Sequence, residues 1–196
     1  TIYSHYPRAV CDSLMNFLGT HDTMRIINTL SPASWKNDLP DNDTLASLRL
    51  TDEERAEARK RAMLAWLVCA TMYGVPCVYY GDEIGMEGWR DPFCRLPMRW
   101  DHPDDEILEV YRAIGEMRRY GAGDSFINGE FEVFRAEKGA LVYRRGRAVI
   151  CVNAGSGVMN AALPRGSRMI YPEKRRGTRT AQIGPLEGAV FMLPEI

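Results

Sequence analysis

Hydrophobic positions follow two different patterns along the chain. Up to about residue 120, short apolar runs alternate with stretches in which apolar residues recur every three or four positions. From Phe126 onward, apolar and polar residues instead alternate in short runs. Residues 51–54 (Thr-Asp-Glu-Glu) form a capping box, which predicts a helix that continues to about Tyr73. A second helix is predicted from Asp104 to about Arg119, with acidic residues in its first turn.

Two apolar runs in the first half, at residues 14–18 and 75–80, predict short buried strands. Because the first predicted helix connects them, the strands should run parallel, as in an open doubly wound sheet or a (β/α)8 barrel. In both folds, ligands bind at the carboxyl ends of the strands. A barrel needs eight such units and roughly 250 residues, and this chain offers about two units. We therefore expect the last two β/α units of a (β/α)8 TIM barrel.

The second half predicts an antiparallel β-sandwich, because seven short runs with strand character are separated by Gly, Pro, Asn or charged residues. The predicted strands are residues 131–134, 140–143, 148–152, 158–163, 169–171, 178–183 and 189–193. The change of pattern places a domain boundary near Gly121 to Asp124. We expect residues 1–122 to be the C-terminal part of the barrel and residues 123–196 to be an all-β sandwich domain.

The composition is that of an ordinary globular protein, with 25 Lys and Arg, 26 Asp and Glu, and a formal net charge of −1. This balance gives no reason to expect nucleic acid or a membrane surface as a partner. The five cysteines lack metal-binding or paired spacing and are expected to be reduced, which favours the cytoplasm. The chain begins with Thr1 rather than Met, which suggests that it starts inside a longer polypeptide.

Candidate chemistry gathers where the predicted strands end. The first run stops at Gly19 and is followed by His21 and Asp22, an imidazole and an acid on one short loop. A polar turn that happens to contain this pair is the simpler interpretation of the spacing alone. The second run ends at Asp82 and Glu83, and the loop from residue 86 to 102 is rich in aromatic and guanidinium groups. A loop of this length is more often functional than idle.

Three segments, residues 14–25, 74–88 and 91–95, closely resemble the last sequence regions of the α-amylase family of glycoside hydrolases. They read LMNFLGTHDTMR, GVPCVYYGDEIGMEG and DPFCR. The second and third look most like the branch that contains neopullulanase, cyclomaltodextrinase and maltogenic amylase. The resemblance is strong over residues 6–120. It implies part of a retaining hydrolase that acts on α-glucans such as maltodextrins, cyclodextrins, pullulan or starch.

The resemblance also implies roles for individual residues. Asp22 would be the catalytic carboxylate that stabilises the transition state, and His21 would bind the same sugar at the cleavage subsite. Asp91 and Arg95 match positions that bind glucose units further toward the non-reducing end. Trp89 could stack on a sugar or anchor its loop. Asp82 and Glu83 are expected to be structural residues at the barrel rim rather than catalytic ones.

Two catalytic groups are expected to be missing. In the family, the nucleophile and the acid/base lie on upstream strands, and no Gly-x-Arg-x-Asp segment occurs in this chain. Retaining hydrolysis needs both carboxylates, so the isolated chain should be inactive although its parent polypeptide would be an enzyme. Missing barrel units would leave strand edges exposed. Expected partners are an α-glucan oligosaccharide and either the rest of the barrel or a second copy of the chain.

Other functions remain open. The chain could be a non-catalytic carbohydrate-binding or packing module, or a relative that cleaves α-1,6 bonds or converts sucrose or trehalose. A metal-dependent hydrolase built on His21 and Asp22 would need more histidines than His5 and His102 supply. We therefore expect neither a metal nor another cofactor.

Overall fold

The computed structural model describes residues 2–33, 38–172 and 180–195. Contacts divide the chain into two compact units. Unit 1 comprises residues 1–16, 67–76 and 112–196, and unit 2 comprises residues 17–66 and 77–111. The helices are α1 (Arg8–Asp12), α2 (Ile26–Thr29), α3 (Asn42–Ser47), α4 (Asp52–Thr71) and α5 (Asp105–Glu116). The strands are β1 (Met15–Phe17), β2 (Val75–Cys77), β3 (Phe131–Glu137), β4 (Ala140–Arg145), β5 (Ala148–Asn153), β6 (Met159–Ala162), β7 (Arg168–Tyr171), β8 (Thr180–Ile183) and β9 (Glu187–Met192).

The two strands predicted in the first half pair with each other. β1 and β2 are neighbours in a two-stranded sheet, and the N–H of Val75 donates a hydrogen bond of 2.7 Å to the carbonyl of Leu14. The run 75–80 is typical of a strand covered on both faces, yet only its first three residues are a strand and Val75 is 59% exposed. Met15 on β1 is 62% exposed. Apolar side chains of this small sheet therefore face solvent.

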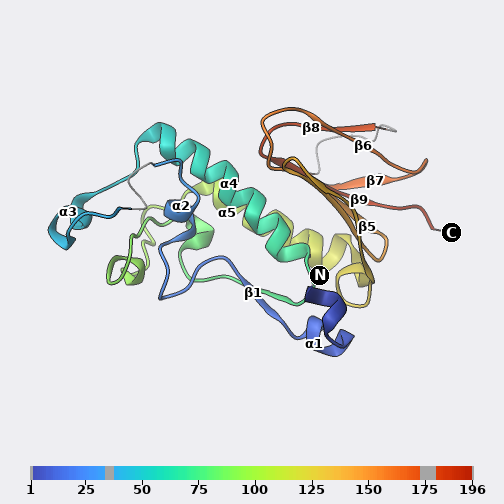
Figure 1. The fold of residues 1–196 in the computed structure, drawn as a ribbon, viewed down its shortest axis with the longest axis horizontal. Coiled ribbons are helices and arrows are strands. Elements are labelled where there is room, and N and C mark those ends of the chain that lie inside the picture. Colours follow the sequence, from blue (N-terminus) through green and yellow to red (C-terminus); the bar gives the residue numbers. More distant parts are fainter. Residues whose placement is uncertain (1, 34–37, 173–179, 196) are drawn as a thin grey trace. The chain divides into compact units, whose positions relative to one another are not determined.

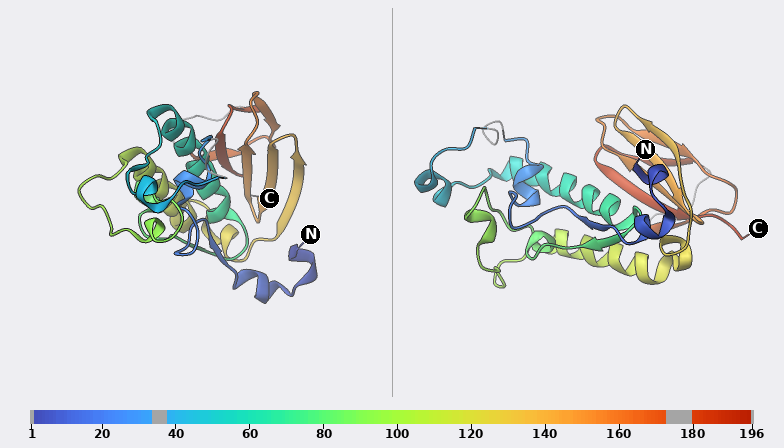
Figure 2. Two further views of the ribbon diagram at one scale, coloured as in Figure 1. Left: turned by 60° about the vertical axis from the view of Figure 1, so that its left-hand side comes forward. Right: turned by 60° about the horizontal axis from the view of Figure 1, so that its bottom comes forward.

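The capping box predicted at residue 51 is confirmed at the start of α4. The hydroxyl of Thr51 accepts a hydrogen bond from the N–H of Glu54, and the Glu54 carboxylate accepts one from the N–H of Thr51. α5 begins where Asp104 accepts a hydrogen bond from the N–H of Ile107. Within unit 2, Trp66 of α4 stacks on Tyr111 of α5 with ring centroids 4.5 Å apart. The two helices accordingly lie side by side there (Figure 2).

The polar segment between Ser31 and Thr44 runs into the short helix α3. α3 is capped by Asp41, whose carboxylate accepts a hydrogen bond of 3.0 Å from the N–H of Thr44. Leu45 of this helix is buried, with 1% of its surface exposed. Residues 34–37 of this segment lie outside the described residues.

The second half of the chain is antiparallel β-structure, as predicted. β3, β4, β5, β9 and β7 form a five-stranded sheet in that order, and β6 pairs with β8 (Figure 1). The described strands correspond to the seven predicted runs, except that residues 178–179 lie outside the described residues. One apolar core joins both sheets: Val149, Cys151 and Phe191 come from the larger, and Met159 and Ile183 from the smaller.

A single buried amide also links the two sheets. Asn153, at the end of β5, donates from Nδ2 to the carbonyls of Gly157, Ile183 and Gly184, at 2.7, 3.0 and 3.0 Å. Its Oδ1 accepts a hydrogen bond from the N–H of Gly155. Because every polar atom of this side chain has a partner, its burial costs little.

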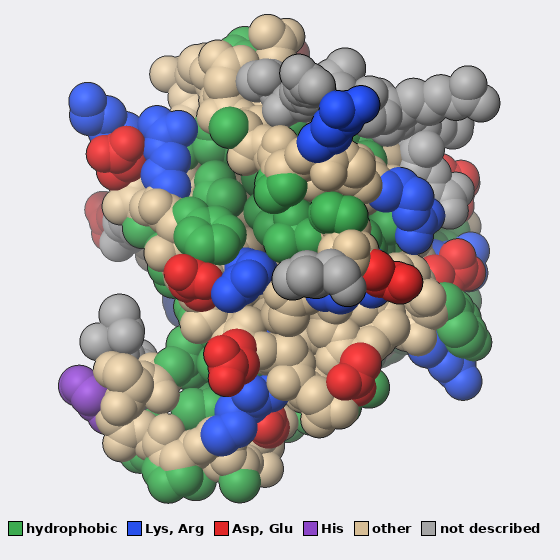
Figure 3. Space-filling model, turned by 90° about the vertical axis from the view of Figure 1, so that its right-hand side faces the viewer, with side chains coloured by type: hydrophobic (Ala, Val, Ile, Leu, Met, Phe, Trp, Pro, Cys, Tyr) green, Lys and Arg blue, Asp and Glu red, His purple; other side chains and the backbone are tan. Residues whose placement is uncertain are grey.

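The surface of unit 1 mixes apolar and charged groups. On the face seen in Figure 3, hydrophobic side chains gather in the middle with Lys, Arg, Asp and Glu side chains around them. On the edge strand β3, Val133 and Phe134 are exposed. All five cysteines are free thiols, and four of them are buried. Among the described residues, the helices are too short or too polar to cross a membrane.

Candidate functional site

His21 and Asp22 lie on an exposed turn of unit 2 that connects β1 to α2. Thr20 and Thr23 close the turn: the N–H of Thr20 donates to the hydroxyl of Thr23 at 3.1 Å, and the N–H of Asp22 donates to the hydroxyl of Thr20. The His21 Nε2 lies 3.2 Å from the Asp22 carboxylate, and both side chains are more than 60% exposed. The turn thus presents an imidazole and a carboxylate together to solvent.

Arg95 brings the distant loop to this turn. Its Nε donates to the carbonyl of His21 at 3.0 Å and lies 2.7 Å from the Asp91 carboxylate. The Arg95 NH2 nitrogen lies 3.2 Å from the Asp22 carboxylate. The thiol of Cys94 also donates to the carbonyl of His21. Four of the five predicted site residues are therefore together, although about 70 positions separate them in the sequence.

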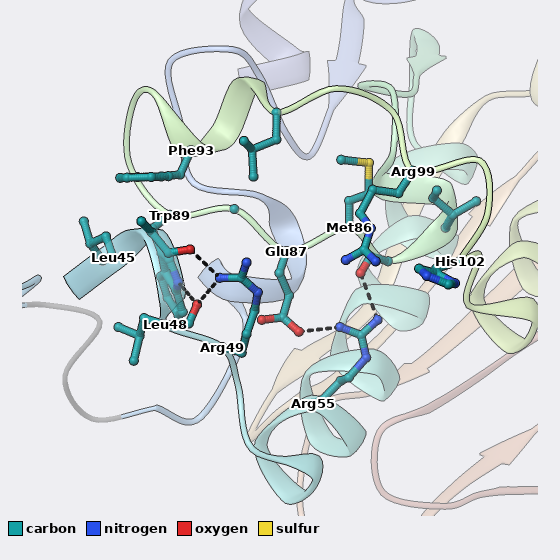
Figure 4. A pocket seen from close by; sticks show the side chains of 15 residues that line it. Leu45, Leu48, Arg49, Arg55, Met86, Glu87, Trp89, Phe93, Arg99 and His102 are labelled. Carbon is teal, nitrogen blue, oxygen red and sulfur yellow. Dashed lines mark hydrogen bonds and ion pairs between the residues drawn. The ribbon is translucent and has the colours of Figure 1, made fainter. Parts of the chain in front are cut away.

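Trp89, the fifth predicted residue, is buried. Only 1% of it is exposed, and its indole N–H donates a hydrogen bond of 3.0 Å to the carbonyl of Leu48 (Figure 4). This position supports the interpretation that Trp89 anchors its loop, because a buried ring cannot stack on a ligand.

A cavity of about 90 Å³ lies beside Trp89. Arg49, Arg99, His102 and Glu87 also line it, and the Glu87 carboxylate is held 2.5 Å from Arg55 (Figure 4). The N–H of Leu50 donates to the same carboxylate at 3.0 Å. These contacts with Arg55 and Leu50 hold the Glu87 carboxylate in place and give it a structural role.

Beneath the His21–Asp22 turn lies a buried charge pair that the sequence did not indicate. Arg25 is fully buried and Asp82 is 3% exposed, and the Arg25 NH1 lies 3.7 Å from Asp82 Oδ1. Arg25 packs against the rings of Tyr79 and Tyr80, 4.3 and 4.4 Å from their centroids, and donates to the carbonyl of Tyr80. The sequence predicts a structural role for Asp82 but does not indicate Arg25 as its partner.

The environment of Asp82 shifts its proton equilibrium. Burial raises the pKa of Asp82 to about 6, and the nearby Glu83 carboxylate adds to the rise. The Arg25 charge and the N–H of Ile26 act in the opposite direction and offset only part of it. Burial therefore outweighs the attraction of the ion pair, as expected when two charges are removed from water.

The exposed cluster of His21, Asp22, Asp91 and Arg95, which we call the His–Asp–Arg cluster, offers both donors and acceptors. Carboxylates accept hydrogen bonds from hydroxyls, whereas guanidinium and imidazole N–H groups donate to them. Such a set suits a neutral polyhydroxylated ligand better than an ion of either sign. No group of three or more acidic, histidine or cysteine side chains that could hold a metal ion occurs within residues 2–33, 38–172 and 180–195.

Comparisons with known proteins identify relatives of the chain. The chain is 32% identical over 136 residues to a cyclomaltodextrinase of Bacillus sp, covering 68% of the chain and 19% of the relative. It is 33% identical over 146 residues to neopullulanase 2 of Thermoactinomyces vulgaris, covering 74% of the chain and 20% of the relative. The chain thus spans about a fifth of the length of these relatives.

Solved structures show the same fold. The α-amylase of Anoxybacillus superposes on 99% of this chain and 40% of its own chain, with a TM-score of 0.73 and 20% identity. The family model described as "Alpha amylase, catalytic domain" matches residues 2–116, which include the whole His–Asp–Arg cluster. The chain therefore belongs to the α-amylase family.

Proposed function

We propose that the His–Asp–Arg cluster binds the hydroxyl groups of an α-glucan at the cleavage subsite of a retaining glycoside hydrolase. In this proposal Asp22 stabilises the transition state, His21 binds the same sugar, and Asp91 and Arg95 bind or order the neighbouring glucose units. The observation that carries it is Arg95, which contacts the main chain of His21 and both carboxylates. Family membership and the names of the relatives support an α-glucan as the ligand.

The chemistry of glycoside cleavage explains why these groups would be placed together. Cleavage develops positive charge at the anomeric carbon, and hydrogen bonds to the sugar that tighten in the transition state lower the barrier. A carboxylate oriented by Arg95 and His21 needs little reorganisation when that charge appears. The proposed role of Asp22 is therefore electrostatic and does not require it to form a covalent bond.

We further propose that residues 1–122 are the last two β/α units of a barrel and that residues 123–196 are its C-terminal sandwich. The nucleophile and the acid/base would then come from barrel strands outside this sequence. The exposed Met15 and Val75 support this arrangement, because another part of the barrel or a second copy would cover them. Sedimentation distinguishes these outcomes, since a chain that uses a second copy should form a concentration-dependent dimer.

The sugar-binding proposal can be tested with the chain as it is. Because the sequence contains only three histidines, ring NMR signals can be followed for each during a titration with maltotetraose. We expect saturable shifts at His21 but none at His5 or His102. Replacing Asp22 by Asn should weaken binding about tenfold, the usual loss for a hydrogen bond to a charged group.

The chain offers a matched control for Asp22→Asn. Asp101 and His102 form a second exposed pair with the same 3.2 Å separation but outside the His–Asp–Arg cluster. Asp101→Asn should leave maltotetraose binding unchanged. Equal losses in both variants, or no shift at His21 in the wild type, would contradict the proposal. The alternative, a non-catalytic carbohydrate-binding or packing module, would gain support if the chain bound maltotetraose and assemblies that include the missing barrel showed no turnover.

A further inference from the structure

The Asp82 carboxylate contacts the His21–Asp22 turn at both of its ends. At the start of the turn it lies against Gly19, so closely that a Cβ built there would be 2.3 Å from Asp82 Oδ2. At the end of the turn it lies 3.7 Å from the Arg25 NH1, and the N–H of Ile26 favours its charged form. The residues between these contacts are those that carry the exposed imidazole and carboxylate.

The surroundings of Arg25 hold the end of the turn in place. Its backbone N–H donates to the carbonyl of Gly88 at 2.9 Å, and its guanidinium donates to the carbonyl of Tyr80. Gly88 has equally little room, since a Cβ there would lie 2.5 Å from the carbonyl oxygen of Phe93. The turn is therefore tied to two segments that follow β2.

Stability alone does not explain a pair of this kind. Asp82 Oδ1 and two nitrogens of Arg25 have no hydrogen-bond partner among the described residues. Apolar residues of similar volume often stabilise a protein as much as a buried ion pair does, or more. The Arg25–Asp82 pair makes directional contacts with the turn, which apolar residues could not make.

We propose that Asp82 is a positioning residue for the His–Asp–Arg cluster: together with Arg25 it fixes both ends of the turn and thereby the placement of His21 and Asp22. Asp82 itself touches no ligand, because it is buried beneath the turn. The importance of this placement for sugar binding rests on the proposed function. The placement of the turn, however, can be measured without any sugar.

The test compares Asp82→Asn with Asp104→Asn. Asp104 is a fitting control because its side chain is also buried in unit 2 and paired with arginine, at 2.9 Å from Arg59. Removing either carboxylate should lower the unfolding temperature. Only Asp82→Asn should shift the ring NMR signals of His21 and weaken maltotetraose binding about tenfold.

A second variant keeps the test decisive if Asp82→Asn does not fold. Arg25→Lys keeps a positive charge beside Asp82. It loses the planar guanidinium group, which contacts both Asp82 and the Tyr80 carbonyl. It should shift the His21 signals in the folded protein, whereas Arg59→Lys should not.

The two proposals fail in different ways. Unchanged His21 signals in every folded variant at Asp82 and Arg25 would overturn the positioning role, even if the variants were less stable. Shifted His21 signals in a protein that binds no maltotetraose would support positioning and contradict the sugar-binding function.

Discussion

Arg95 illustrates how a single side chain defines the candidate site. An isolated carboxylate on an exposed turn is free to rotate, and its hydrogen bonds are worth little in water. Arg95 restricts the carboxylates of Asp22 and Asp91 and holds the His21 main chain at the same time. The planar guanidinium makes this possible, because its donors have a fixed geometry that lysine lacks.

Asp82 should give the protein a measurable dependence of stability on pH. Its pKa rises from 3.8 in the unfolded chain to about 6 in the folded protein, so the folded state binds more protons between these values. Its contribution to the free energy of unfolding therefore falls as pH rises from about 4 to about 6, by up to about 3 kcal/mol, and stays constant above that. Arg25 and Glu83 are the charged groups that act on it.

Urea unfolding between pH 4 and pH 7 checks this expectation. The difference in unfolding free energy between the wild type and Asp82→Asn isolates this residue, because asparagine does not titrate. As the pH rises from about 4 to about 6, the wild type should lose stability relative to Asp82→Asn, so this difference in unfolding free energy should fall. A constant difference, or one that moves the other way, would show that burial does not control this carboxyl group.

At the scale of elements, hydrogen bonds at helix ends fix where the helices begin. α4 starts at a reciprocal pair between Thr51 and Glu54, and α5 starts at the carboxylate of Asp104. Asp104 also binds Arg59 of α4 at 2.9 Å, so one side chain caps one helix and ties it to the other within unit 2. Local sequence and tertiary packing thus specify the same boundaries.

Removing the cap of α4 should lower stability without altering the site. Thr51→Ala eliminates the hydroxyl that accepts the Glu54 N–H, and caps of this type contribute about 1 kcal/mol. Urea unfolding should show this loss, while Thr51→Ser, which keeps the hydroxyl, should stay close to the wild type. Equal stability of all three proteins would mean that packing alone sets the start of α4.

Much of this fold follows from local sequence. The capping box, the two long helices and the alternating strands of the second half depend on near neighbours, and the structure confirms them. The resemblance points to Asp22 and Arg95 as site residues, but their ion pair comes from the structure. The burial of Trp89 and the pair of Arg25 with Asp82 depend on contacts between distant segments. No local pattern encodes those contacts, so only the structure reveals them.

At the scale of the whole molecule, the proposed function gives the chain a sugar-binding turn without a complete catalytic apparatus. Retaining hydrolysis requires a nucleophile and an acid/base about 5 to 5.5 Å apart. The His–Asp–Arg cluster supplies the stabilising groups that we propose, and the proposal assigns neither of those two roles to a residue of this chain. Binding and turnover should therefore be separable in this protein.

Hydrolysis assays test that separation. The chain alone should release no detectable glucose or maltose from cyclodextrin, pullulan or starch, because the proposed function assigns the nucleophile and the acid/base to strands outside its residues. An unrelated α-amylase serves as the positive control for each substrate. Clear turnover by the purified chain that disappears in Asp22→Asn would contradict this view and would place the missing carboxylates within these 196 residues.

The close approach of Asp82 to Gly19 has a consequence for anyone who wishes to redesign the turn. A side chain at position 19 would occupy the space that the carboxylate at position 82 already fills. A larger residue at position 19 alone should therefore unfold the protein or displace the turn, whereas a paired change, with a larger residue at 19 and a smaller one at 82, keeps the volume constant. A library that redesigns the turn should vary these two positions together.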